Sequence, residues 1–158
     1  MAAFPTEKTR TDADGCRETV LQAPSSHEAV ESIIDRLSHV IRDLPLSDTA
    51  RYRLQFVVHE ALTNAVTHGN RVDPTKLVTA TCRCGPDQVT VTVEDEGEGF
   101  DPGSVPDPTA EPNILRESGR GIFLMRSYAD ACRFENGGRR VVLVKRYDLP
   151  HDGPPDID

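Results

Sequence analysis

The chain has 158 residues, which suits one domain with a single hydrophobic core. Hydrophobic residues make up 37% of the chain and charged residues 28%, the usual balance of a globular protein. Because 26 acidic residues outnumber 18 basic ones, the formal net charge is −8. This charge argues against direct DNA binding, whose affinity comes largely from basic side chains on phosphates.

The chain also lacks signals for membranes or secretion. No apolar run approaches the roughly 20 residues of a membrane-spanning helix. Residues 1–15 have no apolar signal core, so we expect a cytoplasmic protein without membrane contact. Its cysteines form no zinc-binding pattern, and reduced thiols are the favoured interpretation. They are Cys16, Cys82, Cys84 and Cys132.

The first part of the chain predicts a tail, a strand and a helix. Residues 1–16 are polar and are expected to form a flexible N-terminal tail. Residues 19–23 suit a first strand. Ser25, with Glu28 three residues later, forms a capping box at the start of a helix. Apolar residues then recur at steps of three and four until Pro45 ends this helix.

A second amphipathic helix and a hairpin follow. Ser47 or Asp48 caps the helix, and Gly69 ends it. Two strands come next, joined by a Gly-Pro-Asp turn that predicts a hairpin. The two strands are expected at 76–83 and 88–95.

The last part of the chain begins with a long loop at residues 101–118, which holds four prolines. A loop of this length in a small domain is usually a lid or a binding loop. A short helix is expected at 121–129, followed by strands at 132–135 and 139–147 and a loose tail at 149–158. Helices packed on one face of a mostly antiparallel sheet satisfy this order of elements.

The first motif lies in the second predicted helix, where Glu60, Asn64 and His68 are spaced four residues apart. They share one face beside the apolar stripe, so they should line a cleft at the edge of the core. The Asn64 carbonyl oxygen suits Mg²⁺ shared with phosphates, Glu60 could accept a proton, and His68 could donate to a phosphate. A solvated polar helix face is the alternative, and His59 is interpreted as a structural or rim residue.

The second motif is Glu94-Asp-Glu-Gly-Glu-Gly-Phe100, at the end of a predicted strand. The alternation along the strand points Asp95 toward the core side, where a buried carboxylate needs donors such as an adenine amino group. Gly97 and Gly99 let the backbone turn tightly and approach a flat ring. An acidic turn without a ligand is the alternative.

The third motif is Ser118-Gly-Arg-Gly-Ile-Phe-Leu-Met125. Gly119 and Gly121 precede a predicted helix, so free N–H groups would face an anion. Arg116 and Arg120 could grip a γ-phosphate. A plain glycine-rich helix start is the alternative. Together the motifs predict an ATP site, although neither a P-loop nor a protein-kinase glycine loop is present.

These three motifs resemble the N, G1 and G2 boxes of the GHKL ATPase superfamily, which includes gyrase, a heat-shock chaperone and histidine kinases. The closer similarity is to the stand-alone branch, the anti-sigma-factor serine/threonine kinases of bacterial partner switching. It rests on the stretch from Glu60 to Gly69 and on the stretch from Gly119 to Asp130. The resemblance covers about residues 18–147.

The resemblance implies an α+β fold, a two-layer α/β sandwich of the Bergerat type with a mixed, mostly antiparallel sheet. The ATPase domain would span residues 17–148, between the tails at 1–16 and 149–158. Asn64 would bind Mg²⁺, Glu60 would be the catalytic base and Asp95 would bind the adenine amino group. The loop 101–118 would be the ATP lid. The glycines that would shape the nucleotide site are Gly97, Gly99, Gly119 and Gly121.

The resemblance also implies partners. Members of this branch phosphorylate a Ser or Thr of an anti-anti-sigma protein with a STAS domain, sequester a sigma factor, and are usually homodimers. This chain departs from the branch in its lid, which is acidic and rich in proline, so gripping the γ-phosphate would rest on Arg116 and Arg120.

Two other functions stay open. The chain could be a nucleotide-dependent protein-binding regulator without significant kinase activity, in which ATP orders the lid. It could also be a detached histidine-kinase catalytic domain, which would transfer phosphate to a histidine of another chain.

Overall fold

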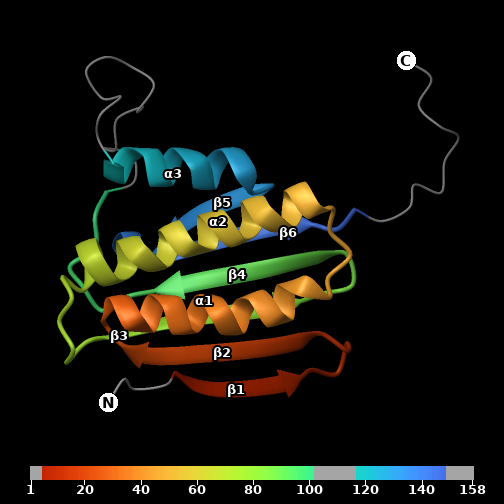
Figure 1. Cartoon of the computed structure of the whole chain (residues 1–158), viewed down its shortest axis with the longest axis horizontal. Helices are drawn as coiled ribbons and strands as arrows, with labels where there is room; N and C mark the ends of the chain where they lie inside the picture. The colour runs from red at the N-terminus through yellow and green to blue at the C-terminus, as the bar shows by residue number, and fades with distance from the viewer. Residues whose placement is uncertain (1–4, 102–116, 149–158) are drawn as a thin grey trace, which may run out of the picture.

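The computed structural model describes residues 5–101 and 117–148. Six strands form one sheet in the order β1-β2-β3-β4-β6-β5, and every neighbouring pair is antiparallel (Figure 1). The strands are β1 Thr6–Thr11, β2 Arg17–Pro24, β3 Leu77–Cys84, β4 Gln88–Glu94, β5 Ala131–Glu135 and β6 Arg140–Arg146.

Three helices lie across one face of this sheet (Figure 1). They are α1 His27–Arg42, α2 Asp48–Asn64 and α3 Glu117–Tyr128. Two short helical turns complete the described elements, the π-helical η1 Ala65–Gly69 and the 3₁₀ turn η4 Asn136–Gly138. The predicted α+β sandwich is confirmed, with an antiparallel arrangement at each described pairing. None of the helices described is both long and apolar enough to cross a bilayer.

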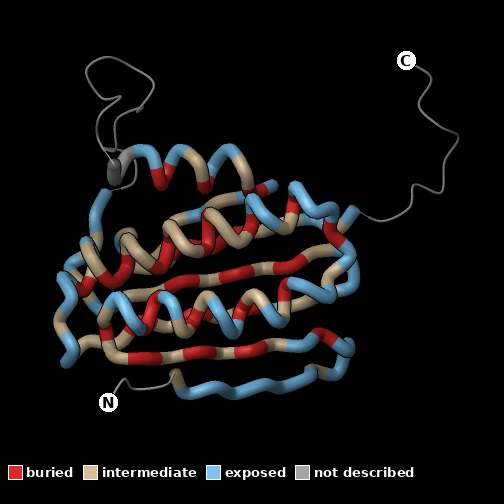
Figure 2. The backbone as a smooth tube through the Cα atoms, viewed as in Figure 1, coloured by how far each residue is buried: buried red, intermediate tan, exposed pale blue. Residues whose placement is uncertain are grey.

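The hydrophobic core lies between the sheet and the helices, as Figure 2 shows by the buried positions that alternate along the strands. On β4, Val89, Val91 and Val93 are buried and face the helices, while the residues between them are partly exposed. This alternation with period two is the pattern that predicted the strand from the sequence. On α1, apolar residues three and four positions apart form the buried stripe that covers the sheet.

The first helix begins one residue later than predicted. Ser26 is the N-cap, and its side chain accepts a hydrogen bond from the Ala29 N–H at 3.0 Å. Ser25 does not cap the helix. It is buried, and its backbone N–H donates to the Lys76 carbonyl beside the sheet. The predicted capping box at Ser25 is therefore wrong. For α2, Ser47 is the cap and accepts from the Ala50 N–H at 3.1 Å.

The prediction of a flexible tail over residues 1–16 is wrong for residues 6–11, which form edge strand β1. This strand pairs with β2 in antiparallel register, with Thr9 opposite Thr19. All six of its residues are exposed, so it carries none of the apolar alternation that marks a strand in the sequence. Two ion pairs add to the backbone ladder, Arg10 with Glu18 and Arg36 of α1 with Glu7.

Candidate functional site

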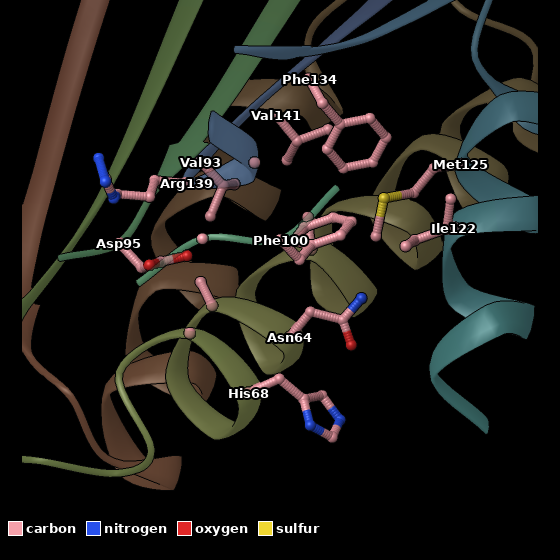
Figure 3. Close-up of a pocket in the computed structure, with 15 residues that line it drawn as sticks. Asn64, His68, Val93, Asp95, Phe100, Ile122, Met125, Phe134, Arg139 and Val141 are labelled. Atoms are coloured by element: carbon pink, nitrogen blue, oxygen red, sulfur yellow. The ribbon is translucent and has the colours of Figure 1, made fainter. Parts of the chain in front are cut away.

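Two neighbouring cavities open where the end of α2 meets α3 and the carboxyl end of β4. The first has a volume of about 290 Å³ and lies between η1, β4, β6 and α3 (Figure 3). The second lies between α2 and the start of α3. Asn64 and His68 line both cavities, so the two cavities adjoin at these residues. The predicted stripe of Glu60, Asn64 and His68 therefore does line a cleft.

Asp95 lies in the wall of the first cavity, just beyond the end of β4 (Figure 3). Its backbone N–H donates to the Arg139 carbonyl, and its Oδ1 accepts from the Gly97 N–H at 2.8 Å. Partial burial raises the pKa of Asp95, while the Gly97 N–H and the Arg139 guanidinium act in the opposite direction. A carboxylate has about four acceptor positions, so Asp95 retains capacity for a donor from a ligand.

The glycines beside Asp95 bring two segments into direct contact. A β-carbon at Gly69 would overlap the Asp95 carboxylate, and one at Gly97 would overlap the Gly69 carbonyl. The turn after β4 thus packs against the end of the second helix with no room for side chains. The absence of a side chain at Gly97 is what allows the close contact with the Gly69 carbonyl. Gly99 lines the cavity and has a positive φ of 79°, which favours glycine.

Asn70 holds this arrangement together, and the sequence analysis gave it no role. The side chain is fully buried. Its Nδ2 donates to Ser25 Oγ at 2.5 Å and to the Leu77 carbonyl at 2.9 Å, and its Oδ1 accepts from the Glu96 N–H at 2.8 Å. Asn70 therefore ties the turn that carries Asp95 to β2 and β3. An Asn after a helix-ending Gly resembles an ordinary helix end, which hides this role.

An apolar wall faces Asp95 across the first cavity, and the sequence analysis missed most of it. Phe100 and Phe134 meet edge to face, with ring centroids 5.4 Å apart. Ile122 and Met125 of α3 add to this wall (Figure 3). The Phe100 N–H donates to the Gly137 carbonyl at 2.9 Å, which anchors Phe100 to the β5–β6 hairpin. An apolar cavity with a carboxylate on one side suits an aromatic ring with an amino group.

Arg139, also missed, lines the same cavity. Its Nε donates to the Gly97 carbonyl at 2.9 Å. Arg139 thus holds the turn after β4, and its charge lies near Asp95. The Asn136-Gly-Gly turn just before it was predicted as a hairpin, which β5, η4 and β6 confirm, but nothing in the sequence indicated that it borders the site.

The second cavity holds Glu60, Asn64, His68, Arg120 and Gly121. Here α3 lies close to α2, and Gly121 leaves room for this approach. A β-carbon at Gly121 would lie 3.0 Å from Glu60 Oε2 and 3.3 Å from Asn64 Nδ2. A carboxylate, an amide and a guanidinium therefore border one space. This set can accept a proton, ligate a hard cation and contact an anion.

The third motif lies differently from the prediction. Gly119 and Gly121 lie inside α3, which begins at Glu117, and do not precede it. Gly119 is still within the first helical turn, where backbone N–H groups lack intrahelical partners, whereas Gly121 serves the close packing of α3 on α2. Arg116 and most of the predicted lid lie outside the described residues. His59 contacts Glu31 on α1 at 3.2 Å, so it does not enter either cavity.

Comparison with known proteins agrees with this arrangement. A profile of the family described as histidine kinase-like ATPase domain matches residues 23–145. A protein named anti-sigma F factor from Clostridium perfringens (strain SM101 / Type A) is 30% identical over 124 residues, which cover 75% of this chain and 83% of that relative.

Two further relatives extend the comparison. An anti-sigma F factor from Geobacillus stearothermophilus is 35% identical over 100 residues, or 60% of this chain and 68% of that protein. The serine-protein kinase RsbW from Oceanobacillus iheyensis is 26% identical over 144 residues, or 87% of this chain and 91% of that protein. The chain therefore belongs to the histidine kinase-like ATPase domain family, in the branch of the anti-sigma-factor serine/threonine kinases.

Proposed function

We propose that this chain binds ATP with Mg²⁺ and transfers the γ-phosphate to a Ser or Thr of an anti-anti-sigma protein with a STAS domain. The observation that carries the proposal is the adjacency of the two cavities. A slot for an aromatic base, marked by Asp95, shares Asn64 and His68 with a space bordered by Glu60 and Arg120. The names of the relatives, anti-sigma F factor and serine-protein kinase, support the same activity.

In this proposal the first cavity holds adenine. The base lies against the apolar wall that includes Phe100 and Met125, and its amino group donates to the Asp95 carboxylate. The backbone of Gly99 borders the base, and the Gly97 N–H holds the Asp95 carboxylate beside it. The triphosphate extends past Asn64 toward α3. His68 and the N–H groups of the first turn of α3, including that of Gly119, are donors for the phosphates.

The donors in the second cavity fit Mg²⁺. Within the described residues, no group of three His, Cys, Asp or Glu side chains is placed to hold a metal ion. Mg²⁺ bound with nucleotide phosphates needs only one or two protein ligands and keeps several waters. The Asn64 amide oxygen is a hard ligand and borders the second cavity, so Asn64 would hold the ion. When bound, Mg²⁺ neutralises phosphate charge.

The chain's own residues then act on the acceptor. Glu60 accepts the proton of the Ser or Thr hydroxyl, whose oxygen forms a new bond to the γ-phosphorus. The bond between the γ-phosphorus and the bridging oxygen breaks, and its electron pair leaves with ADP. Arg120 borders the same cavity and contacts the transferring group, a role that Arg116 shares in the sequence prediction. The proton on Glu60 passes to solvent.

We further propose the regulatory setting that the names of the relatives suggest. The chain would act in the cytoplasm as an anti-sigma factor and would sequester a sigma factor until the STAS partner competes for it. It would work as a homodimer, and without direct contact to DNA or a membrane.

Calorimetric titration with ATP, with and without Mg²⁺, tests the nucleotide site. We expect binding that depends on Mg²⁺ and that Asp95→Asn abolishes. The amide oxygen would accept from the Gly97 N–H, which leaves the NH₂ group facing the adenine amino group, itself a donor. A folded wild-type chain that binds no ATP would refute the site.

Phosphotransfer to purified STAS-domain proteins tests the activity. We expect acid-stable phosphate on the partner with wild type and none with Glu60→Ala, while ATP affinity stays near the wild-type value. Transfer that survives in Glu60→Ala would show that Glu60 is not the base. Acid-labile phosphate would instead indicate a histidine acceptor, and stoichiometric partner binding without transfer would indicate a regulator that is not a kinase.

A further inference from the structure

Three aromatic side chains form a strip along α2 and α3 that leads to the second cavity. Tyr52 stacks on Phe56 with centroids 6.5 Å apart, and Phe56 meets Tyr128 of α3 edge to face at 6.3 Å. The ATP site as described uses none of these rings. We call Tyr52, Phe56 and Tyr128 the aromatic strip.

The strip is continuous with the site of the proposed transfer. Tyr52, Phe56 and Glu60 are four residues apart on α2, so they follow one helix face. Phe56 lines the second cavity together with Glu60, and Leu124 of α3 lines it from the other side. In Figure 1, α2 and α3 lie side by side, with the start of α3 next to the end of α2. A polypeptide whose hydroxyl reaches Glu60 from this side therefore crosses the strip.

The strip is exposed at Tyr52, whereas Phe56 and Tyr128 are partly buried against the hydrophobic core. Tyr52 is 67% exposed, the highest value among the large apolar and aromatic residues that the structure describes as exposed. Rigid aromatic side chains with a polar tip contribute a large contact area at low entropic cost, and they are enriched where proteins bind one another. An exposed tyrosine stacked on Phe56, which lines the second cavity together with Glu60, is such a surface.

Positive charge flanks the strip in a chain whose net charge is −8. The Arg53 guanidinium lies over the Tyr128 ring, 4.9 Å from its centroid, and Arg120 borders the second cavity at the other end. Asp48, near the start of α2, is already paired with Arg51 at 3.0 Å. Acidic side chains on an approaching segment would therefore meet arginines at both ends of the strip.

We propose that the aromatic strip and Arg53 dock the segment of the protein substrate that carries the acceptor Ser or Thr, and that this segment is apolar and acidic. This inference rests on the proposed kinase function and adds the chemistry of the substrate. The apolar side chains cover Tyr52 and Phe56, an acidic side chain pairs with Arg53, and the hydroxyl reaches Glu60.

Synthetic decapeptides with one serine test the docking surface without knowledge of the partner. One set has aspartate and leucine around the serine, and the other has lysine and leucine. With wild type we expect kcat/KM for the acidic set to exceed that for the basic set by about tenfold. Arg53→Glu should reverse this preference, and Tyr52→Ala should raise KM for the acidic set with little change in kcat.

The control is Arg133→Glu, the same charge change on β5, where the Arg133 side chain is 66% exposed and faces away from the helices. It should leave the preference of wild type intact. ATP affinity, measured by calorimetry, should be the same in Arg53→Glu and Arg133→Glu. An unchanged preference in Arg53→Glu, or an equal effect of Arg133→Glu, would overturn the docking surface.

NMR titration with the same acidic peptides separates this inference from the kinase proposal. If no peptide is phosphorylated by a chain that binds ATP, the activity is in doubt, but the surface is still tested. Shifts confined to Tyr52, Arg53, Phe56 and Tyr128 would support docking at the strip. Shifts only elsewhere, or none at millimolar peptide, would refute it whether or not transfer occurs.

Discussion

Gly69 is a residue at which the nucleotide site has no room for a side chain. Since a β-carbon there would overlap the Asp95 carboxylate, either the carboxylate or the end of the helix must move to admit one. We predict that Gly69→Ala lowers ATP affinity by at least about tenfold. It should lower the free energy of unfolding by about 1–3 kcal/mol, as overpacking does elsewhere.

Calorimetric titration and urea unfolding measure these two effects. Gly85→Ala is the matched control, because its β-carbon would meet only the Gln88 carbonyl, at 3.2 Å, in a hairpin outside the site. It should bind ATP like wild type. Wild-type affinity in Gly69→Ala would show that the contact between Gly69 and Asp95 does not position the carboxylate.

Asp95 links the stability of the fold to pH. Because its pKa is raised by burial, the folded state holds the Asp95 proton more tightly than the unfolded chain does. The stabilisation from this proton is fully present below the ordinary pKa of about 3.9 and is lost as pH rises through the raised pKa. We predict that Asp95→Asn, which cannot ionise, is at least as stable as wild type at pH 7 although it does not bind ATP.

Urea unfolding of both proteins at pH 7 and near pH 4 tests this sign. The advantage of Asp95→Asn should shrink at the lower pH, where a larger share of the wild-type carboxyl carries its proton in the folded state. A variant that is less stable than wild type by the same amount at both values of pH would contradict the prediction. In that case the hydrogen bond from Gly97 would matter more than the charge.

At the scale of elements, strand β1 combines exposure with an edge position. It covers the edge of β2 and lies at the far end of the sheet from β5 and β6. We predict that deletion of residues 1–11 leaves ATP affinity unchanged and lowers the free energy of unfolding by about 1–2 kcal/mol, from the loss of a few exposed cross-strand pairs. It should also promote self-association, because β2 becomes the edge.

Urea unfolding, calorimetry and light scattering measure these outcomes. Replacing both Arg10 and Glu18 by Ala is the milder control, since it removes one surface ion pair and keeps the backbone ladder. Loss of ATP binding in the deletion variant would mean that β1 supports the site across the whole sheet.

The elements also show which parts of the fold the sequence could predict. Strands such as β4 alternate between apolar and polar residues, and α1 carries apolar residues at helical spacing, so burial on one face made both predictable. Strand β1 is polar throughout, so its pairing depends on the neighbouring strand and was missed. The start of α3 was placed four residues late because glycines at 119 and 121 resemble a loop.

Some residues of the candidate site could be predicted from the sequence, and others could not. Glu60, Asn64 and Asp95 lie in compact motifs, where spacing along one helix or strand places the side chain. Phe134 and Arg139 line the first cavity from a hairpin that is distant in the sequence from the other motifs. A pattern within one segment cannot predict a contact between segments that lie so far apart in the chain. Asn70 was hidden because its partners, Ser25 and Glu96, come from separate segments.

At the scale of the whole molecule, ligand binding and folding are linked. The first cavity is walled by η1, β4, β6 and α3, so a bound nucleotide contacts elements from both layers of the sandwich. We predict that ATP with Mg²⁺ at 100 times its Kd stabilises the protein by about 2.7 kcal/mol. For a chain of this length, each kcal/mol raises the Tm by roughly 2–4 °C.

Thermal unfolding with increasing ATP measures this shift. The Tm of Asp95→Asn should not respond to ATP, whereas that of Glu60→Ala should respond like wild type if Glu60 acts only in transfer. An equal response in wild type and Asp95→Asn would indicate nucleotide binding outside the first cavity.

The π-helical turn at the end of α2 gives this segment one residue more than an α-helical path would need. In η1 the Asn70 N–H bonds to the Ala65 carbonyl, five residues back, so this turn holds one residue more than an α-helical turn would. Loss of Thr67 would let the segment rewind as α-helix, and the shorter turn would still leave Gly69 and Asn70 close to Asp95. Loss of a residue within α2 has no such compensation and would rotate the rest of the helix by about 100°. Single-residue deletions should therefore be tolerated far better in η1 than in α2.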